Sequence, residues 1–227
     1  MIRKTLTASL LALAVAAPFA QAYEAGDIIV RAGAITVDPN ESSSAVKAGG
    51  TAVAGTKATL DADTQLGLNF VYMLNSNVGV ELLAATPFQH TVGVKGFGAP
   101  IDGNLGDLKH LPPTLSLVYY PLDTKSAFRP YVGAGINYTW FFDDKLSSSA
   151  ENSALQLRGL DMKDSWGWAA QVGADFMLTD NVMLNAQLRY IDIETTGTTY
   201  SNTLGAKVKV DVDVDPWVYM VGLGYKF

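Results

Sequence analysis

Segments in which hydrophobic and polar residues alternate recur along most of the chain. In residues 65–74, Leu66, Phe70 and Tyr72 share one parity, whereas Gln65 and Asn69 share the other. Side chains on a β-strand point alternately to its two faces, so this pattern predicts strands with one apolar and one polar face. Eight such segments occur, at residues 27–37, 61–74, 78–90, 111–122, 128–142, 163–178, 182–195 and 208–227.

The connections between these segments differ in length according to their position. Those after the second, fourth and sixth segments are short, at residues 75–77, 123–127 and 179–181, and the others are long. An even number of strands with short turns at one end and long loops at the other is typical of outer-membrane β-barrels. A soluble β-sandwich also has many strands and turns, but it does not usually sort its loops by length. The sequence therefore predicts an all-β fold, an eight-stranded antiparallel transmembrane β-barrel.

The first 22 residues have the pattern of a secretory signal peptide. Arg3 and Lys4 give a positive start, residues 10–17 are apolar, and Ala20-Gln21-Ala22 resembles a cleavage site. The apolar run is too short to cross a membrane, and a buried N-terminal helix is the less favoured alternative. We expect residues 1–22 to direct Sec-type export and residues 23–227 to form a barrel in the outer membrane of a Gram-negative cell.

Composition and charge narrow the choice of partners. The chain has 227 residues, is 48% hydrophobic, carries a net charge of −6 and contains no cysteine. An acidic chain without a basic stripe argues against a nucleic-acid partner. The lack of cysteine excludes disulfide bonds and thiolate metal ligands. We predict no cofactor and no metal site.

The apolar face changes parity near the C-terminus. The valines of residues 208–214 occupy even positions, whereas Trp217, Tyr219 and the later apolar residues occupy odd ones, and Pro216 lies at the change. A bulge at Pro216 would flip the strand and keep the valines outside. A straight strand would instead place the valines in the upper lumen, with the intervening aspartates outside above the membrane.

The preceding strand favours the straight arrangement. Beyond Tyr190, the outward positions are taken by Asp192 and Glu194, with no proline to cause a bulge. One cause for both inversions is more economical, so we predict an apolar upper lumen. Its predicted lining is Ile191, Ile193, Val208, Val210, Val212 and Val214. Such a lumen is a dry site for small apolar molecules; the alternative is a core that merely stabilises the extracellular end.

Four charged residues fall on inward positions. These are Arg31, Glu81, Asp175 and Arg189. Charges that face a narrow lumen need partners, so we predict a salt-bridged plug. A polar core that fills a small barrel is favoured over a selectivity element. We expect nearby amides at Gln65, Asn69, Asn137, Gln171 and Gln187.

Several stretches resemble one known family. They are VDVDPWVYMVGLGYKF at the C-terminus, LPPTLSLVYYPL at residues 111–122, RPYVGAGINYTWFFD at 129–143 and VELLAATPF at 80–88. The whole chain after residue 22 is similar to the OmpW family, with the greatest likeness to its OprG-type members. The resemblance implies an eight-stranded outer-membrane barrel with a hydrophobic upper lumen and a lateral opening, associated with passage of small, mainly hydrophobic molecules. The terminal Phe227 also resembles the signal that the barrel-assembly machinery reads.

Three prolines mark one seam of the expected barrel. Pro87 lies in the third segment, and Pro112 and Pro113 begin the fourth. Proline cannot donate a hydrogen bond to a β-ladder, so this seam loses donors at its upper end. The family resemblance implies a lateral gate here, and ordinary strand termination beside a loop is the alternative.

The evidence for a metal site, a cation-binding face or an enzymatic activity is weaker. His90 and His110 flank one loop, but two histidines are too few for a typical metal site. The acidic face above the membrane could hold divalent cations among lipopolysaccharide head groups, although a solvated face is favoured; its members are Asp192, Glu194, Asp211, Asp213 and Asp215. No Ser-His-carboxylate set is recognisable, which argues against an enzyme.

Together these features predict an outer-membrane channel for small, mainly hydrophobic molecules, with an apolar upper lumen and a lateral opening. The alternative is a structural or receptor-like barrel without a transport role. Expected partners are hydrophobic solutes, outer-membrane lipids and lipopolysaccharide, and the assembly machinery during insertion.

Overall fold

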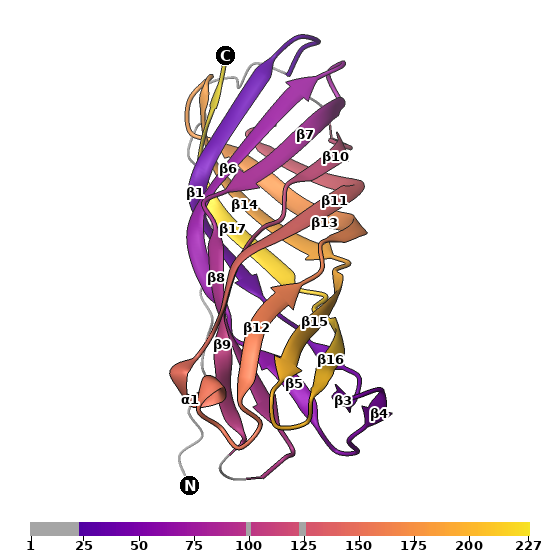
Figure 1. Ribbon diagram of the computed structural model, residues 1–227. Helices are drawn as coiled ribbons and strands as arrows, with labels where there is room; N and C mark the ends of the chain where they lie inside the picture. The colour runs from indigo at the N-terminus through magenta and orange to yellow at the C-terminus, as the bar shows by residue number, and fades with distance from the viewer. Residues whose placement is uncertain (1–22, 99–100, 123–125) are drawn as a thin grey trace, which may run out of the picture.

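The protein is a closed, eight-stranded antiparallel β-barrel that extends beyond its membrane-spanning part (Figure 1). The computed structural model describes residues 23–98, 101–122 and 126–227. The predicted signal peptide at residues 1–22 lies outside these ranges. The barrel strands are β1 (Ile28–Asp38), β6 (Asp63–Met73), β7 (Val78–Ala85), β10 (Thr114–Tyr119), β11 (Phe128–Leu146), β13 (Ser165–Met177), β14 (Val182–Ile191) and β17 (Trp217–Lys226). Each pairs with its neighbours in chain order, and β1 pairs with β17 to complete the ring.

The long connections fold into further strands at the end of the barrel opposite its short turns. We call this the upper end, and Figure 1 draws it at the bottom. The connections contain β2 (Ser42–Ser43), β3 (Lys47–Ala48), β4 (Thr51–Ala52), β5 (Lys57–Leu60), β8 (Phe88–Lys95), β9 (Gly103–Leu111), β12 (Leu157–Met162), β15 (Glu194–Ser201) and β16 (Ala206–Asp213), with the short helix α1 (Ser148–Glu151). Strands β5, β8 and β9 continue the barrel sheet beyond β11, and β12, β15 and β16 belong to a second sheet. The lumen therefore continues well past the barrel itself. None of the helices in the described ranges is long and apolar enough to cross a membrane.

The sequence segments correspond to the barrel strands, but several boundaries were wrong. The seventh segment is broken between β14 and β15, and the eighth is broken between β16 and β17. The third segment is interrupted at Thr86 and Pro87, which lie between β7 and β8. Residues 91–110, expected as a loop, instead contribute to the β8–β9 hairpin. The physical reason is that alternation continues there, since Phe88, His90 and Val92 are all buried on one face of β8.

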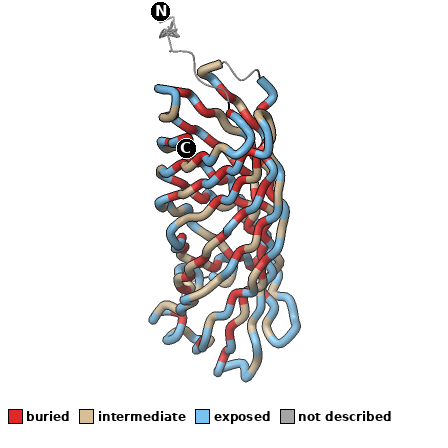
Figure 2. Tube along the Cα trace, turned by 90° about the horizontal axis from the view of Figure 1, so that it is seen from above, coloured by how far each residue is buried: buried red, intermediate tan, exposed pale blue. Residues whose placement is uncertain are grey.

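Buried and exposed residues alternate along the strands, as Figure 2 shows. The outer face of the barrel is a belt of exposed apolar side chains. It includes Leu66, Phe70, Leu117, Ile136, Trp166, Val172, Leu184, Val221 and Leu223. Near the upper edge of the belt, the ring of Tyr190 lies 5.3 Å from that of Trp168 and 5.4 Å from that of Trp217. Aromatic girdles of this kind border the lipid-facing band of outer-membrane barrels.

The parity change near the C-terminus lies at short breaks in both strands, between Ile191 and Glu194 on one and between Asp213 and Trp217 on the other. Tyr190 pairs with Trp217, and Glu194 pairs with Asp213. Three residues separate the paired positions on each strand, so neither carries the extra residue that defines a bulge. The bulge account is wrong, because the strands keep their register while the environment outside them changes from lipid to water.

The interior is layered. A lower apolar cluster near the short turns includes Ile29, Met73 and Met183. An upper apolar cluster includes Ile35, Phe88, Ile193 and Val214. The inward charges lie between them. The layer of charged residues therefore lies below an apolar part of the lumen.

Glycines narrow the barrel around the charged layer. Gly33 pairs with Gly67 on one side and Gly222 on the other. A Cβ atom at Gly33 would lie 2.1 Å from the Val221 carbonyl oxygen, which is impossible without moving a strand. The backbones approach closely here because these three residues have no side chain.

Candidate functional site

Arg31 is the centre of the charged layer and is fully buried. Its guanidinium contacts Asp175 through two hydrogen bonds, from Nε to Oδ1 at 3.0 Å and from Nη2 to Oδ2 at 2.6 Å. It also donates to Asn69 Oδ1 at 3.0 Å and to the Tyr120 hydroxyl at 2.7 Å. Its Nη1 lies 3.4 Å from Glu81 Oε2. A bidentate pair with further hydrogen bonds is the geometry in which a buried charge pair is tolerated.

Glu81 connects this pair to a second arginine. Arg189 Nη2 lies 2.5 Å from Glu81 Oε1, and both side chains are almost completely buried. Gln171 donates to the same carboxylate at 2.8 Å, and Gln187 donates to it at 3.3 Å. The four charged residues therefore form one network, which we call the plug and define as Arg31, Glu81, Asp175 and Arg189.

Some predicted neighbours of the plug lie elsewhere. Asn69, Gln171 and Gln187 join it, but Asn137 donates to the carbonyls of Pro112 and Pro113, at 3.0 and 3.1 Å. Gln65 also lies apart, since its amide donates to Asp63 and its oxygen accepts from Thr86.

Sequence reasoning missed three tyrosines around the plug. Tyr120 bonds Arg31, Tyr131 lies under the Arg31 guanidinium at 5.1 Å, and the Tyr23 hydroxyl donates to Asp175 at 2.9 Å. Strand parity would have placed Tyr120 and Tyr131 inside. Nothing in the local pattern marks Tyr23, which precedes the first strand.

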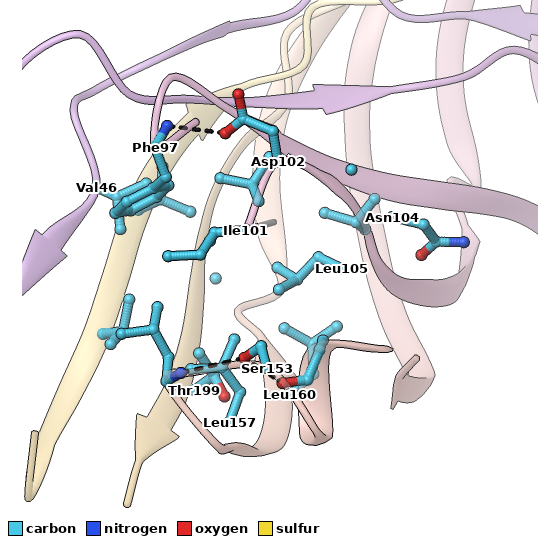
Figure 3. A pocket seen from close by; sticks show the side chains of 18 of the residues that line it. Val46, Phe97, Ile101, Asp102, Asn104, Leu105, Ser153, Leu157, Leu160 and Thr199 are labelled. Carbon is cyan, nitrogen blue, oxygen red and sulfur yellow. Dashed lines mark hydrogen bonds between the residues drawn. The ribbon is translucent and has the colours of Figure 1, made fainter. Parts of the chain in front are cut away.

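The upper lumen is apolar. Ile191, Ile193, Val212 and Val214 are buried, and Val208 and Val210 are half-buried on the same face. The three valines from Val208 to Val212 line a cavity of about 140 Å³. Figure 3 shows Ile101, Leu105, Leu157 and Leu160 around it. We call this space the upper cavity.

A smaller space, the lower cavity, has a volume of about 20 Å³ and shares Leu60 and Met162 with the upper one. It is lined by Val37, Leu60, His90, Leu108, His110, Phe141, Met162, Ile193, Thr195, Val214 and Pro216. Because the two cavities have two wall residues in common, they lie next to each other along the lumen.

Two histidines in the wall of the lower cavity contact each other. Their Nε2 atoms are 2.8 Å apart, and His90 Nδ1 lies 2.6 Å from the Asp61 carbonyl oxygen. The His110 ring also stacks against Phe88, with ring centroids 5.4 Å apart. Burial lowers the pKa of His90 and lowers that of His110 to about 3, so both rings are neutral at pH 7. Within the described residues, no group of three or more His, Cys, Asp or Glu side chains is arranged to hold a metal ion.

The prolines lie where the pairing of the seam is interrupted. The β7–β10 ladder ends at Leu83 and Thr114, and the β8–β9 ladder begins at Phe88 and His110. Pro87 lies in the gap on one side, and Pro112 and Pro113 lie in it on the other, so all three fall between strands rather than within them. Because proline has no N–H, the gap has few donors with which to close.

On its β6 side, the same region is held by carboxylates. The Gln89 N–H donates to Asp63 Oδ2 at 2.8 Å, and the Thr91 N–H donates to Asp61 Oδ1 at 2.6 Å. These side chains replace the missing backbone ladder between β6 and β8.

Acid should destabilise the protein through the histidine pair. An unfolded histidine binds a proton near pH 6.5, whereas folded His110 does so only near pH 3. The unfolded state therefore binds more protons in this interval, and this contribution to stability is complete above pH 6.5 and falls by up to about 1.4 kcal/mol per pH unit below it. Urea unfolding in lipid vesicles between pH 7.5 and 4.5 measures the slope. The His90→Phe/His110→Phe variant should show a shallower slope, and identical slopes would refute the assignment.

Comparisons with known proteins agree with this architecture. The sequence profile of the OmpW family matches residues 24–227. The chain belongs to the OmpW family. This OmpW-family barrel is 46% identical over 206 residues to outer membrane protein W of Vibrio cholerae, covering 91% of each chain. It superposes on the crystal structure of OprG from Pseudomonas aeruginosa with a TM-score of 0.87 and 52% identity, covering 91% of this chain and 98% of that one.

A more distant relative has a name that refers to metabolism. The dibenzothiophene metabolism operon protein PahQ of Pseudomonas aeruginosa is 27% identical, with 82% of each chain covered. The family relatives are outer-membrane proteins, and this OmpW-family barrel is an outer-membrane protein as well.

Proposed function

We propose that this protein passes small, mainly hydrophobic molecules from the cell exterior into the outer membrane. The observation that carries the proposal is the apolar upper lumen directly above a charged plug. A chamber lined by valine, leucine and isoleucine has favourable contacts for an apolar solute. The relationship to PahQ supports the same class of solute, since dibenzothiophene is a hydrophobic molecule.

The plug makes a straight route to the periplasm unfavourable. A solute moving down past Arg31 and Glu81 would separate buried charges from their partners. Each polar group left unsatisfied costs about 1–3 kcal/mol, and more when it is charged. We infer that the solute stays above the plug.

The proline seam offers a sideways exit. It lies at the level of the lower cavity, since His110 both lines that cavity and pairs with Phe88 beside Pro87. The solute would enter the upper cavity, pass Leu60 and Met162, and leave into the lipid through the gap between the end of the β7–β10 ladder and the start of the β8–β9 ladder. Outer-membrane barrels place their short turns in the periplasm, so this exit faces the outer leaflet.

Replacing Pro87 with alanine tests the exit. The new N–H is a possible donor across the seam, so closing should become more favourable and uptake should fall several-fold. Uptake of a small hydrophobic compound by proteoliposomes, at matched amounts of folded barrel, measures this. Pro130→Ala is the matched control, because Pro130 lies in β11 opposite Ala174 and away from the seam.

Three results are informative. Equal uptake by wild type and Pro87→Ala would exclude lateral exit at this seam. Loss of uptake in Pro130→Ala as well would point to a general effect of removing a strand proline. Uptake no faster than in protein-free vesicles would favour the structural or receptor-like barrel, whose contacts are with lipids, lipopolysaccharide and the assembly machinery.

A further inference from the structure

One junction in the upper wall is not closed by a backbone ladder. The β11–β13 ladder ends at the pair Thr139 and Ser165, and beyond it β11 pairs on one side alone, with β9. Strand β12 lies beside this upper part of β11 (Figure 1), but of the described strands it pairs with β15 alone. Within the described ranges, no backbone hydrogen bond connects the two strands. We call the line between residues 141–146 and 160–164 the β11–β12 joint.

Two carboxylates close the joint. Asp164 Oδ1 accepts from the Phe141 N–H at 3.0 Å, and Asp144 Oδ2 accepts from the Met162 N–H at 2.9 Å. Asp164 Oδ2 also accepts from the Tyr138 hydroxyl at 2.6 Å. Each carboxylate therefore reaches from one strand to a backbone N–H of the other. Because a side chain can change rotamer without moving its strand, such contacts break one at a time, unlike a ladder.

Both strands are irregular at the joint. The register of β11 against β9 shifts between Phe142 and Lys145, and Asp143 within this shift has a φ of 56°. The register of β12 against β15 shifts at Gly159, whose φ is 62°. β-Bulges end regular pairing and redirect side chains, and they are common next to functional sites. A bulge in each strand accounts for the missing ladder.

The joint is also part of the wall of both cavities. Phe141 and Met162, whose N–H groups the carboxylates hold, line the lower cavity. Met162 and Leu160 line the upper cavity. Separation of β11 from β12 would therefore connect both cavities to the outside at the point where they meet.

Aromatic side chains flank the outer side of the joint. The rings of Tyr138 and Trp166 lie 4.7 Å apart, and those of Trp140 and Phe142 lie 5.0 Å apart. Trp140 and Trp166 are both more than half exposed. Aromatic residues at this height border the lipid-facing band, so an apolar molecule at the membrane surface meets apolar side chains beside the joint.

We propose that the β11–β12 joint is the entrance through which hydrophobic solutes at the membrane surface reach the two cavities, and that Asp144 and Asp164 hold it closed between passages. This inference rests on the proposed function and adds the route of entry to it. The solute passes between Phe141 and Met162 rather than through the far end of the upper lumen. The joint is distinct from the proline exit, because it lies on the β12 side of β11 and the prolines lie on the β9 side.

Hydrogen exchange tests whether the joint opens. In lipid nanodiscs, the Phe141 and Met162 N–H groups should exchange about tenfold faster than the hydrogen-bonded N–H groups of the neighbouring β15–β16 ladder, since exchange follows local opening. Residue-resolved NMR measures both. Exchange of Phe141 and Met162 as slow as that of the ladder would overturn the proposal.

A reversible cross-link tests whether solutes use the opening. The chain has no cysteine, so introduced thiols have no competitors. The variant Lys145→Cys/Asp161→Cys places one thiol on each side of the joint, at exposed positions next in sequence to Asp144 and Met162. A reducible bifunctional thiosulfonate should lower uptake of a small hydrophobic compound by proteoliposomes about tenfold, and reduction should restore it.

The matched control cross-links two strands that are already paired. Lys109 and Lys145 both contact Asp143, at 2.8 and 2.6 Å, from the β9–β11 ladder. The cross-linked Lys109→Cys/Lys145→Cys variant should therefore keep its uptake. Equal losses in both cross-linked variants would overturn the proposal, because they would not depend on the joint.

Removal of one carboxylate tests the closing contacts. Asp144→Ala should raise uptake several-fold at matched amounts of folded barrel, because the Met162 N–H loses its acceptor across the joint. Asp143→Ala is the control, since the neighbouring carboxylate contacts lysines of the β9–β11 ladder instead. Uptake by Asp144→Ala no faster than by Asp143→Ala would refute the role of Asp144.

The two proposals can fail separately. Unchanged uptake after cross-linking of the joint, at a level above that of protein-free vesicles, would overturn the entrance and leave the proposed function in place. No uptake above protein-free vesicles by the uncross-linked protein would overturn both.

Discussion

Replacing Arg31 with leucine should lower the free energy of unfolding by about 3–5 kcal/mol. The substitution removes the guanidinium that contacts both oxygens of the buried Asp175 carboxylate, and it also removes a neighbour of Glu81. A buried charge that loses its ion-pair partner is unfavourable, because burial has already removed its hydration. Urea unfolding in lipid vesicles, followed by tryptophan fluorescence, measures the loss.

The matched control removes both charges. The Arg31→Leu/Asp175→Leu variant removes both members of this ion pair, and Glu81 keeps its contact with Arg189 at 2.5 Å. The double variant should therefore be more stable than Arg31→Leu alone. With Asp175→Leu as the second single variant, the loss of stability in the double variant minus the two single losses gives the coupling energy of the pair. If the two single losses simply add, the pair is not the element that stabilises the plug.

Replacing Val212 with aspartate should reduce uptake of a small hydrophobic compound roughly 10- to 100-fold. Val212 is buried and lines the upper cavity. A carboxylate at this position holds water in the chamber, and an apolar solute must displace that water at a cost of about 1–3 kcal/mol. The initial rate of uptake into proteoliposomes measures the effect.

An outward charge on the same sheet serves as the control. Tyr200 is exposed on β15, which pairs with β16, so Tyr200→Asp adds the same charge outside the chamber. Uptake should remain close to that of the wild type in this variant. Similar losses in both variants would mean that net charge, rather than the dryness of the lumen, controls passage.

Strand alternation predicted most of the barrel and the direction of its side chains. The inward positions of Arg31, Glu81 and Asp175 follow from parity alone, because a closed sheet has only an inside and an outside. The switch of the apolar side chains from the outer to the inner face between Tyr190 and Glu194 was also predicted, since two adjacent strands show it. The roles of these residues in transport remain predictions.

Parity does not give the height at which distant strands meet. His90 and His110 were recognised as flanking one connection, but their contact depends on the β8–β9 register and on Asp61, which precedes β6. Tyr23 reaches Asp175 across 152 positions of sequence, and no periodic pattern leads to that contact. The valine side of the upper cavity was predicted, but its opposite wall was not, because residues such as Ile101, Leu105 and Leu157 come from connections with a weaker alternating pattern.

The reversal of faces between Tyr190 and Glu194 acts as a depth marker for the whole protein. Below it the outer surface is apolar, and within four residues of Tyr190 and Trp217 the surface above carries Asp192, Glu194 and Asp213. One residue step along a strand is about 3.3 Å, so sinking by a few ångströms would push carboxylates into hydrocarbon, and rising would lift Trp217 and Tyr190 away from the interface. A bilayer that is too thick or too thin must therefore adjust its own thickness around this barrel, because the strands offer no second position at which to settle.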